Sequence, residues 1–384
     1  MEIYLDNSAT TRVHPEVVAL MVKIMEEDYG NAASLHRKGA EAERYVTRAR
    51  EQVAKTLKTE PGRIYFTSGG TESNNWALIG AAEANRRAGT HIITTSVEHP
   101  SVKKTLAHLE ELGYSVTYLP TDRDGLVSVK DVEDALRPDT ILVSCMYVNN
   151  EIGAVEPVEE IGRMLYKKRP DVLLHADAVQ AYGKFVIRPE RDHIDLLSCS
   201  GHKLRGPKGV GFLYISGRTK IRPILYGGGQ QKGMRSGTEN VPGAAGLGLA
   251  AELAYRDLAR DTEVLRQRKE ELIGRLSALP GVRFNGRTDG TSAPHILSVS
   301  FEGVRSEVML HALEDRGIYV SAGSACASRH PSEISTLSGI GLSKEAQEGT
   351  IRFSLNSQNT EEEIRRTADA VGELLPVLRR FKRR

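Results

Sequence analysis

The sequence predicts an α/β fold in which helices cover a mostly parallel sheet and a smaller α+β domain follows. Between Arg63 and Ile215, short segments rich in β-branched and aromatic residues alternate with longer segments in which apolar residues recur every three or four positions. This alternation is typical of a parallel sheet with helices on both faces. Beyond Asn240, long helical segments precede grouped strand segments. Such grouping favours a separate α+β domain.

The first region contains seven candidate strands. In chain order they span residues 63–68, 91–96, 115–120, 140–147, 172–177, 196–202 and 209–215. The segments of helix length between them include 71–89, 99–113 and 158–168. We therefore expect a mostly parallel seven-stranded sheet.

The second region begins with a long helical pattern over residues 242–279. The strand and helix candidates that follow it are 282–285, 295–303, 307–316, 318–323, 350–355 and a terminal helix. We place the domain boundary inside the long helix, near Ala254. The expected large domain is 15–254, and the expected small domain combines 1–14 with 255–384.

Composition and charge limit the function classes. The 384 residues are 40% hydrophobic and 27% charged, which is typical of a soluble globular chain and excludes a disordered or fibrous one. Lys plus Arg is 52 and Asp plus Glu is 50, so no global charge attracts nucleic acid or an anionic membrane. No membrane-spanning run or signal segment is visible in the sequence. We expect a cytoplasmic protein without nucleic-acid or membrane partners.

The three cysteines lie far apart, which excludes a disulfide framework or a four-thiolate zinc site within one chain. Cys145 and Cys199 fall in strand patterns and are expected to be buried core thiols. Cys326 lies among small residues in SAGSACASRHPSE, without apolar periodicity. We expect it in a mobile loop that can expose the thiol.

Two polar residues follow the ends of candidate strands. Lys203 comes just after strand 196–202, where an open α/β sheet presents side chains to a ligand. Asp177 ends strand 172–177, and Gln180 lies three residues further on. Taken singly, Lys203 could be an ordinary solvated residue of a loop, and Asp177 could be an ordinary helix cap.

Two further elements begin helices. In TSGGTES, Gly69 and Gly70 permit close backbone approach, and Thr71 opens a helix whose N-terminus favours an anion such as phosphate. The alternative is an ordinary turn capped by a hydroxyl, and no Walker A sequence is present. His99, in EHPSV, suits either a helix cap or a group that stacks on a ring or transfers protons.

Together these elements meet the requirements of pyridoxal phosphate. That cofactor requires a lysine for covalent attachment, a carboxylate beside its ring nitrogen, an anion pocket and a flat group above the ring. A lysine, an aspartate, a phosphate-type helix start and a histidine are all expected at one edge of the sheet. The prediction of a pyridoxal-phosphate site depends on this combination of residues and not on any single one.

Ten motifs then occur in one order along the chain: YLDNSATT, YGNAASLH, FTSGGTESNN, EHPSV, VNNEIG, HADAVQ, SGHKLRGPKGVG, GGGQQKGMRSGTEN, SAGSACAS and IRFSL. In these the sequence resembles the NifS/IscS-type cysteine desulfurases of the class V aminotransferase family. The resemblance implies an aspartate aminotransferase-like fold, which is fold type I of the pyridoxal-phosphate-dependent transferases. Two departures stand out: Asn356 and Ser357 replace the familiar glycine and arginine, and Gly70 stands where alanine is common.

The resemblance implies roles for residues of this sequence. Lys203, Cys326 and His99 would be catalytic: Lys203 would hold the cofactor and move the Cα proton, and His99 would stack on the ring and could take part in proton transfer. Arg352 would clamp the substrate carboxylate, with Asn31 as a second candidate. The implied cofactor contacts are Gly70, Thr71, His99, Asn150, Asp177, Gln180, Ser200, His202 and Lys203, together with Thr238 reaching the neighbouring subunit.

The resemblance also implies the reaction and the partners. L-cysteine would become L-alanine, and the sulfur would pass as a persulfide on Cys326 to an acceptor such as an iron–sulfur scaffold or a tRNA-thiolation enzyme. The protein would be a homodimer, and Cys326 could also ligate a shared iron–sulfur cluster. Two alternatives stay open: a selenocysteine lyase or other class V enzyme, and a protein that mainly binds a partner through its surface and basic tail.

Overall fold

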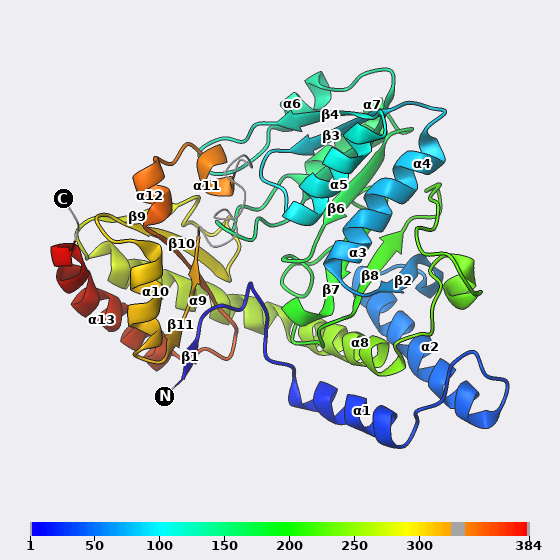
Figure 1. The fold of residues 1–384 in the computed structure, drawn as a ribbon, viewed down its shortest axis with the longest axis horizontal. Coiled ribbons are helices and arrows are strands. Elements are labelled where there is room, and N and C mark those ends of the chain that lie inside the picture. The colour runs from blue at the N-terminus through cyan, green and yellow to red at the C-terminus, as the bar shows by residue number, and fades with distance from the viewer. Residues whose placement is uncertain (1, 324–334, 382–384) are drawn as a thin grey trace.

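A seven-stranded sheet organises the first part of the chain in the computed structural model, which describes residues 2–323 and 335–381 (Figure 1). Its strand order is β2-β8-β7-β6-β5-β3-β4, and only β8 runs antiparallel to its neighbours. The strands are β2 Ile64–Thr67, β3 His91–Thr95, β4 Ser115–Leu119, β5 Thr140–Met146, β6 Leu173–Asp177, β7 Leu196–Ser200 and β8 Gly211–Ile215. The prediction of a mostly parallel seven-stranded sheet is confirmed, because each candidate segment contains one strand.

Helices cover both faces of this sheet. One hydrophobic cluster joins α1 Pro15–Glu26, α2 Arg37–Leu57 and α8 Val241–Arg256 to alternate strand residues such as Val143 and Leu197. A second cluster joins Trp76, α4 Ala81–Asn85 and α5 Pro100–Glu111 to the intervening residues such as Leu142 and Leu196. The remaining helical elements here are η1 Pro61–Arg63, α3 Gly70–Asn75, η2 Trp76–Gly80, α6 Val129–Asp134, α7 Val158–Lys168, η3 Gly201–Lys203 and η4 Gln230–Gly233.

The central strands are buried along their whole length. Every residue of β3, β5, β6, β7 and β8 is buried, as expected where helices cover both faces of a parallel sheet. Side chains that bind a ligand must therefore come from the ends of these strands and from the loops that follow them.

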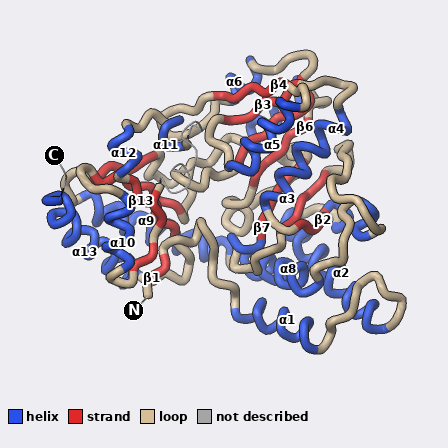
Figure 2. The backbone as a smooth tube through the Cα atoms, viewed as in Figure 1, coloured by secondary structure: helices blue, strands red, loops and turns tan. Residues whose placement is uncertain are grey.

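A second, four-stranded antiparallel sheet lies in the C-terminal part of the chain (Figure 2). Its order is β12-β13-β10-β9, with β9 Val282–Asn285, β10 Ile296–Phe301, β12 Ser321–Ala322 and β13 Thr350–Ser354. The N-terminal β1 Ile3–Tyr4 pairs in parallel with β11 Ile318–Tyr319. The helices are α9 Leu258–Ser277, α10 Ser306–Glu314, α11 Thr336–Gly339, α12 Lys344–Glu348, α13 Glu361–Leu378 and η6 Arg379–Phe381. A hydrophobic cluster of its own fills this part. The division at residue 254 stays a prediction.

The expectation of one long helix over residues 242–279 is wrong. The chain leaves the helical conformation at Asp257 (φ −106°, ψ 9°), which separates α8 from α9. The Asp257 carboxylate accepts hydrogen bonds from the guanidinium of Arg256 and lies 3.4 Å from that of Arg260. Neither Gly nor Pro occurs at the break, so the sequence offers no local signal for it. None of the helices in the described ranges combines the length and apolar character needed to cross a bilayer.

Candidate active site

A cavity of about 220 Å³ opens where β6 and β7 end and α3 and α5 begin. It brings together these residues singled out from the sequence: Gly70, Thr71, His99, Asn150, Asp177, Gln180, Ser200, His202 and Lys203. It is also lined by residues that sequence reasoning missed: Ser8, Asn74, Ser101, Met146, Val148 and Val179. The lining contains one amine and one carboxylate, which is the pair that the sequence placed at two strand ends.

Lys203 is held by backbone carbonyl groups. Its Nζ donates hydrogen bonds to the carbonyl oxygens of Ser8 and Ala9, the latter at 2.7 Å. From the other side, Lys184 Nζ donates to the Lys203 carbonyl oxygen at 2.9 Å. Burial, together with the nearby Lys203, lowers the pKa of Lys184 to about 8. The N-terminal segment thus fixes the Lys203 amine at the cavity, although this segment lies far from Lys203 in the sequence.

Asp177 presents a carboxylate whose two oxygens each accept one hydrogen bond. Asn74 Nδ2 donates to Oδ2 at 2.7 Å, and the Val179 backbone nitrogen donates to Oδ1 at 3.0 Å. The bond to Val179 is the local turn contact expected of an aspartate at a strand end. The carboxylate therefore closes a turn and also lines the cavity.

His99 is both a cap and a cavity residue. Its Nδ1 accepts a hydrogen bond from the Ser101 backbone nitrogen at 3.1 Å, at the start of α5. Burial lowers the pKa of His99, and the positive charges of Lys203 and Lys103 lower it further, against the opposing effect of Asp177. The cap is thus observed, and a role in ring stacking or proton transfer stays a prediction.

The start of α3 also lines the cavity, through Gly70 and Thr71. Gly69, with φ of 152°, makes the turn after β2, and Gly70 and Thr71 then open the helix. Burial and two neighbouring lysines lower the pKa of His202 to about 4, so its ring is neutral at pH 7. Because a neutral imidazole, a hydroxyl and a helix start all donate hydrogen bonds, this part of the cavity suits an anion.

An ion pair holds the helix start in place. Arg235 donates from Nε and Nη2 to the two carboxylate oxygens of Glu72, at 2.8 and 3.0 Å. Glu72 also accepts a hydrogen bond from the Ser68 backbone nitrogen at 2.8 Å. The pair joins α3 to the loop that carries Thr238.

Three buried polar atoms of cavity residues lack hydrogen-bond partners among the described residues: Ser8 Oγ, Asn74 Oδ1 and Gln180 Oε1. Gln180 uses its amide nitrogen to donate to the Ser8 carbonyl oxygen at 3.0 Å. Leaving a buried polar atom without a partner costs about 1–3 kcal/mol. Their concentration here indicates a place where a ligand supplies the missing partners.

Glu98, next to His99, is a buried carboxyl group that the sequence did not single out. One of its oxygens, Oε1, accepts hydrogen bonds from Thr95 Oγ1 at 2.9 Å and from the Met146 backbone nitrogen at 2.8 Å. Met146 pairs directly with Asp177 between β5 and β6. Burial raises the pKa of Glu98 to about 8, and the charge of Asp177 adds to this effect.

Four predicted site residues are not among the described residues that line the cavity. Asn31 borders a different cavity of about 590 Å³, and Thr238 is exposed. Cys326 lies outside the described residues. The remaining one, Arg352, forms an ion pair with Asp6 at 2.9 Å and donates to the Asn150 carbonyl oxygen at 2.8 Å. Arg352 is thus next to a cavity residue but already has a carboxylate partner.

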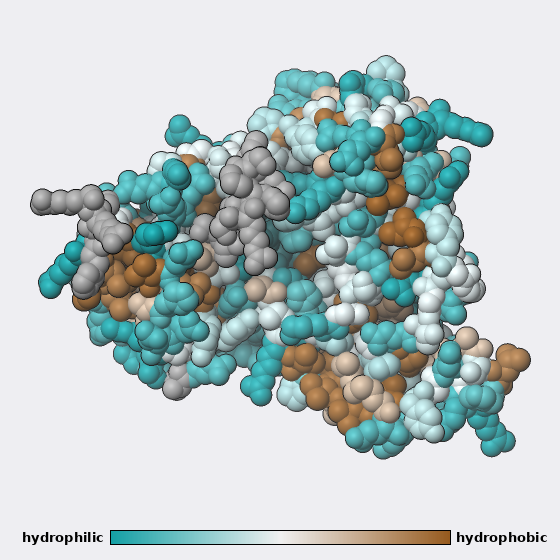
Figure 3. Space-filling model, in the orientation of Figure 1, coloured by the Kyte–Doolittle hydropathy of each residue, from teal (hydrophilic) through white to brown (hydrophobic). Residues whose placement is uncertain are grey.

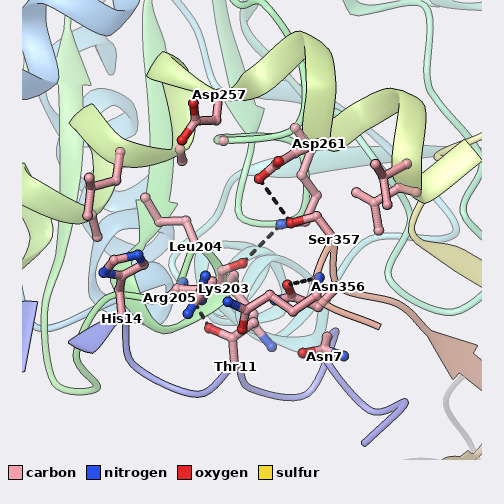
Figure 4. A pocket seen from close by; sticks show the side chains of 18 of the residues that line it. Asn7, Thr11, His14, Lys203, Leu204, Arg205, Asp257, Asp261, Asn356 and Ser357 are labelled. Carbon is pink, nitrogen blue, oxygen red and sulfur yellow. Dashed lines mark hydrogen bonds between the residues drawn. The ribbon is translucent and has the colours of Figure 1, made fainter. Parts of the chain in front are cut away.

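A further cavity, of about 440 Å³, shares Lys203 with the first and is lined by Asn356 and Ser357 (Figure 4). Ser357 donates to Asp261 at 2.9 Å at its edge. Asn356 Oδ1 accepts from the Gln358 backbone nitrogen at 3.1 Å. The two residues that depart from the familiar motif therefore make a polar turn beside this cavity.

Comparison with known proteins supports one family. The model of the aminotransferase class-V family matches residues 3–367. The chain belongs to this family. A cysteine desulfurase IscS of Clostridium botulinum is 44% identical over 384 residues, which is all of this chain and 95% of the relative.

Solved structures agree with this placement. A NifS-like protein superposes with a TM-score of 0.93 at 40% identity, over 98% of this chain and all of the other. A structure described as SspA in complex with cysteine has a TM-score of 0.80 at 34% identity, over 94% of this chain and all of the other. The fold class and the resemblance to NifS/IscS-type proteins are therefore confirmed for this class-V family member.

Proposed function

We propose that this protein is a pyridoxal-phosphate-dependent cysteine desulfurase that converts L-cysteine to L-alanine and carries the sulfur as a persulfide on Cys326. The observation that carries the proposal is the joint presence of Lys203 and Asp177 in one cavity beside a helix start suited to phosphate. Relatives named cysteine desulfurase cover the whole chain, which supports the choice of reaction.

The cavity residues fit the cofactor. Asp177 would keep a proton on the ring nitrogen, and the partnerless Gln180 Oε1 would accept a hydrogen bond from the ring hydroxyl. Gly70, Thr71, Ser200 and His202 would bind the phosphate, and Asn150 would contact the ring. When bound, pyridoxal phosphate withdraws electrons from the substrate Cα, so that its C–H bond can break and re-form.

Lys203 would perform the proton transfers at Cα. Its side chain lines the cavity together with Asp177, and Lys184 Nζ donates a hydrogen bond to its backbone carbonyl oxygen at 2.9 Å. Lys203 would remove the Cα proton and later return a proton to the product.

Arg352 would bind the substrate carboxylate. A planar guanidinium suits bidentate recognition of a carboxylate. Nη2 of Arg352 donates to Asp6 and Nη1 donates to the Asn150 carbonyl oxygen, while its buried Nε has no hydrogen-bond partner among the described residues. Substrate binding would then replace the Asp6 carboxylate with that of cysteine. Asn31 remains a second candidate from the resemblance.

Cys326 would supply the nucleophile. Its thiolate would form an S–S bond to the substrate sulfur while the substrate C–S bond breaks. The electron pair of that bond would stay with the substrate carbon, which would take up a proton so that the product leaves as alanine. The helix that follows this segment, α11, is fixed beside the cavity: Thr336 Oγ1 donates to Glu151 at 3.0 Å, next to Asn150. This attachment supports delivery of the thiol to the cavity.

A homodimer is part of the proposal. Helix α1 exposes Val18, Val22 and Met25 on one side, and Figure 3 shows apolar atoms gathered over this helix. Leu35 and Tyr226 are also largely exposed. Burying such side chains in a second copy would be favourable. Thr238, exposed on the loop that Arg235 fixes, would then reach the phosphate of the partner subunit.

The sulfur acceptor is proposed as a protein such as an iron–sulfur scaffold or a tRNA-thiolation enzyme in the cytoplasm. Ligation of a shared cluster by Cys326 would accompany the delivery of sulfur. The proposed division into domains is 15–254 for the large one and 1–14 with 255–384 for the small one.

The deciding experiment is exposure of the purified protein to L-cysteine, followed by an alanine assay and peptide mass spectrometry. The expected result is alanine together with one added sulfur on the peptide that contains Cys326. Cys326→Ser should abolish this transfer while the bound cofactor keeps its visible absorbance. Sulfide formation at the native rate by Cys326→Ser would refute the proposed nucleophile.

A further inference from the structure

Four side chains at the cavity form one continuous hydrogen-bonded chain. Asn74 Nδ2 lies 2.7 Å from Asp177 Oδ2 and 2.9 Å from Ser101 Oγ. Ser101 Oγ in turn lies 2.8 Å from His99 Nδ1. Asn74 and Ser101 are buried, and all four residues line the cavity. The chain therefore joins the acidic group of the site to its aromatic group.

The direction of the first two bonds follows from donor chemistry. A carboxylate only accepts hydrogen bonds, so Asn74 must turn its amide nitrogen, and not its oxygen, toward Asp177. The second hydrogen of the same nitrogen is donated to Ser101 Oγ. Asn74 thus acts as a double donor, and its oxygen is left without a partner among the described residues.

The tautomer of His99 follows in turn. Ser101 Oγ accepts from Asn74 and keeps its own hydrogen for Nδ1 of His99. The Ser101 backbone nitrogen, which can only donate, reaches the same Nδ1 at 3.1 Å. Because two donors point at Nδ1, this atom must accept, and the hydrogen of the neutral ring lies on Nε2.

We propose that Asn74 and Ser101 are positioning residues that hold His99 as its neutral Nε2–H tautomer, so that the ring donates a hydrogen bond at the cavity and takes up no proton there. The inference rests on the proposed function for the reaction itself. It leaves Lys203 as the only member of this group that moves protons at Cα.

The surroundings of His99 favour the neutral ring. The charged groups that face it are Asp177 at the end of β6, Lys203 after β7 and Lys103 on α5. Burial has the largest effect on its pKa, and it acts with the two lysines to disfavour the charged ring. His99 Nε2 makes no hydrogen bond to another described residue, so its hydrogen is available to a ligand.

The test is the nitrogen NMR spectrum of the histidine rings in the uniformly 15N-labelled, cofactor-loaded protein, recorded over a range of pH. The resonances of His99 are assigned by their loss in His99→Gln. The wild-type ring should show the pattern of the Nε2–H tautomer at neutral pH. In Ser101→Ala the loss of one donor to Nδ1 should raise the pKa of His99 and bring in the second tautomer. Ser101→Thr keeps the hydroxyl and should restore the wild-type pattern.

A matched control separates this effect from loss of a helix cap. Ser128 caps α6 with its hydroxyl and is not among the residues that line the cavity, so Ser128→Ala should leave the His99 signals unchanged. An Nδ1–H tautomer or a charged ring in the wild type at neutral pH would overturn the inference, as would an unchanged spectrum in Ser101→Ala. The spectrum reports the tautomer of His99 directly and does not depend on alanine production. Failure of the tautomer proposal can therefore be distinguished from failure of the proposed desulfurase reaction.

Discussion

The close contact between Gly70 and Val179 makes one substitution especially informative. A Cβ added at Gly70 would lie 2.7 Å from Val179 Cγ2, well inside van der Waals contact, and 3.7 Å from Ser200 Cβ. Val179 is β-branched and therefore stiff at χ1, so it can yield only by moving as a whole. Since Val179 lines the cavity, we expect this movement to change the wall of the space assigned to the cofactor.

The expected cost of Gly70→Ala follows from this geometry. Overpacking by one methyl group costs about 1–3 kcal/mol, and the reduced entropy of the unfolded chain returns about 0.4–1 kcal/mol to folding. The strain falls on the cavity, so we expect cofactor binding to weaken by about 1–2 kcal/mol, which is roughly a 5–30-fold increase in Kd. The assay is an absorbance titration of the cofactor-free protein with pyridoxal phosphate.

Two variants control this experiment. Val179→Ala combined with Gly70→Ala removes the clashing Cγ2 and should restore a Kd close to that of the wild type. Gly274→Ala, in α9, meets no atom within 4 Å and should leave cofactor binding unchanged. A Gly70→Ala variant that binds the cofactor as tightly as the wild type, or a double variant without recovery, would refute the reasoning.

Two further predictions concern charged groups. Burial raises the pKa of Glu98 to about 8, so the folded state favours the protonated carboxyl group. The resulting stabilisation is fully present below the ordinary pKa of glutamate and is lost as the pH rises toward 8. Glu98→Gln should flatten this decline in melting temperatures measured between about pH 5 and 8, and parallel curves would contradict the assignment. Asp6→Asn should release Arg352 for the substrate, lowering the KM for cysteine by roughly 5-fold, equivalent to about 1 kcal/mol, in steady-state assays. A higher KM would instead show that Asp6 orients Arg352.

The large sheet and the two strand ends that place Asp177 and Lys203 could be predicted because they depend on the local pattern of apolar residues in the sequence. Seven apolar segments of strand length gave the seven strands; Asp177 ends one of them and Lys203 follows another. Since parallel strands place their carboxyl ends at one edge, the meeting of the amine and the carboxylate in one cavity follows from topology.

The contacts that orient these groups could not be predicted. Asp6 and Arg352 are separated by 346 positions, and no local pattern connects them. The N-terminal carbonyl groups that hold Lys203 lie 195 and 194 positions away. Asn74 gave a weak signal, because it lies one helical turn after Thr71 and so shares its face. The break at Asp257 gave none.

In the proposed enzyme, Lys203 is the residue that binds the cofactor covalently. Reduction of the loaded protein with borohydride, followed by peptide mass spectrometry, reads this attachment directly. The cofactor mass is expected on the peptide containing Lys203. Attachment to Lys184, whose pKa burial lowers to about 8, or absence of any labelled lysine would contradict it.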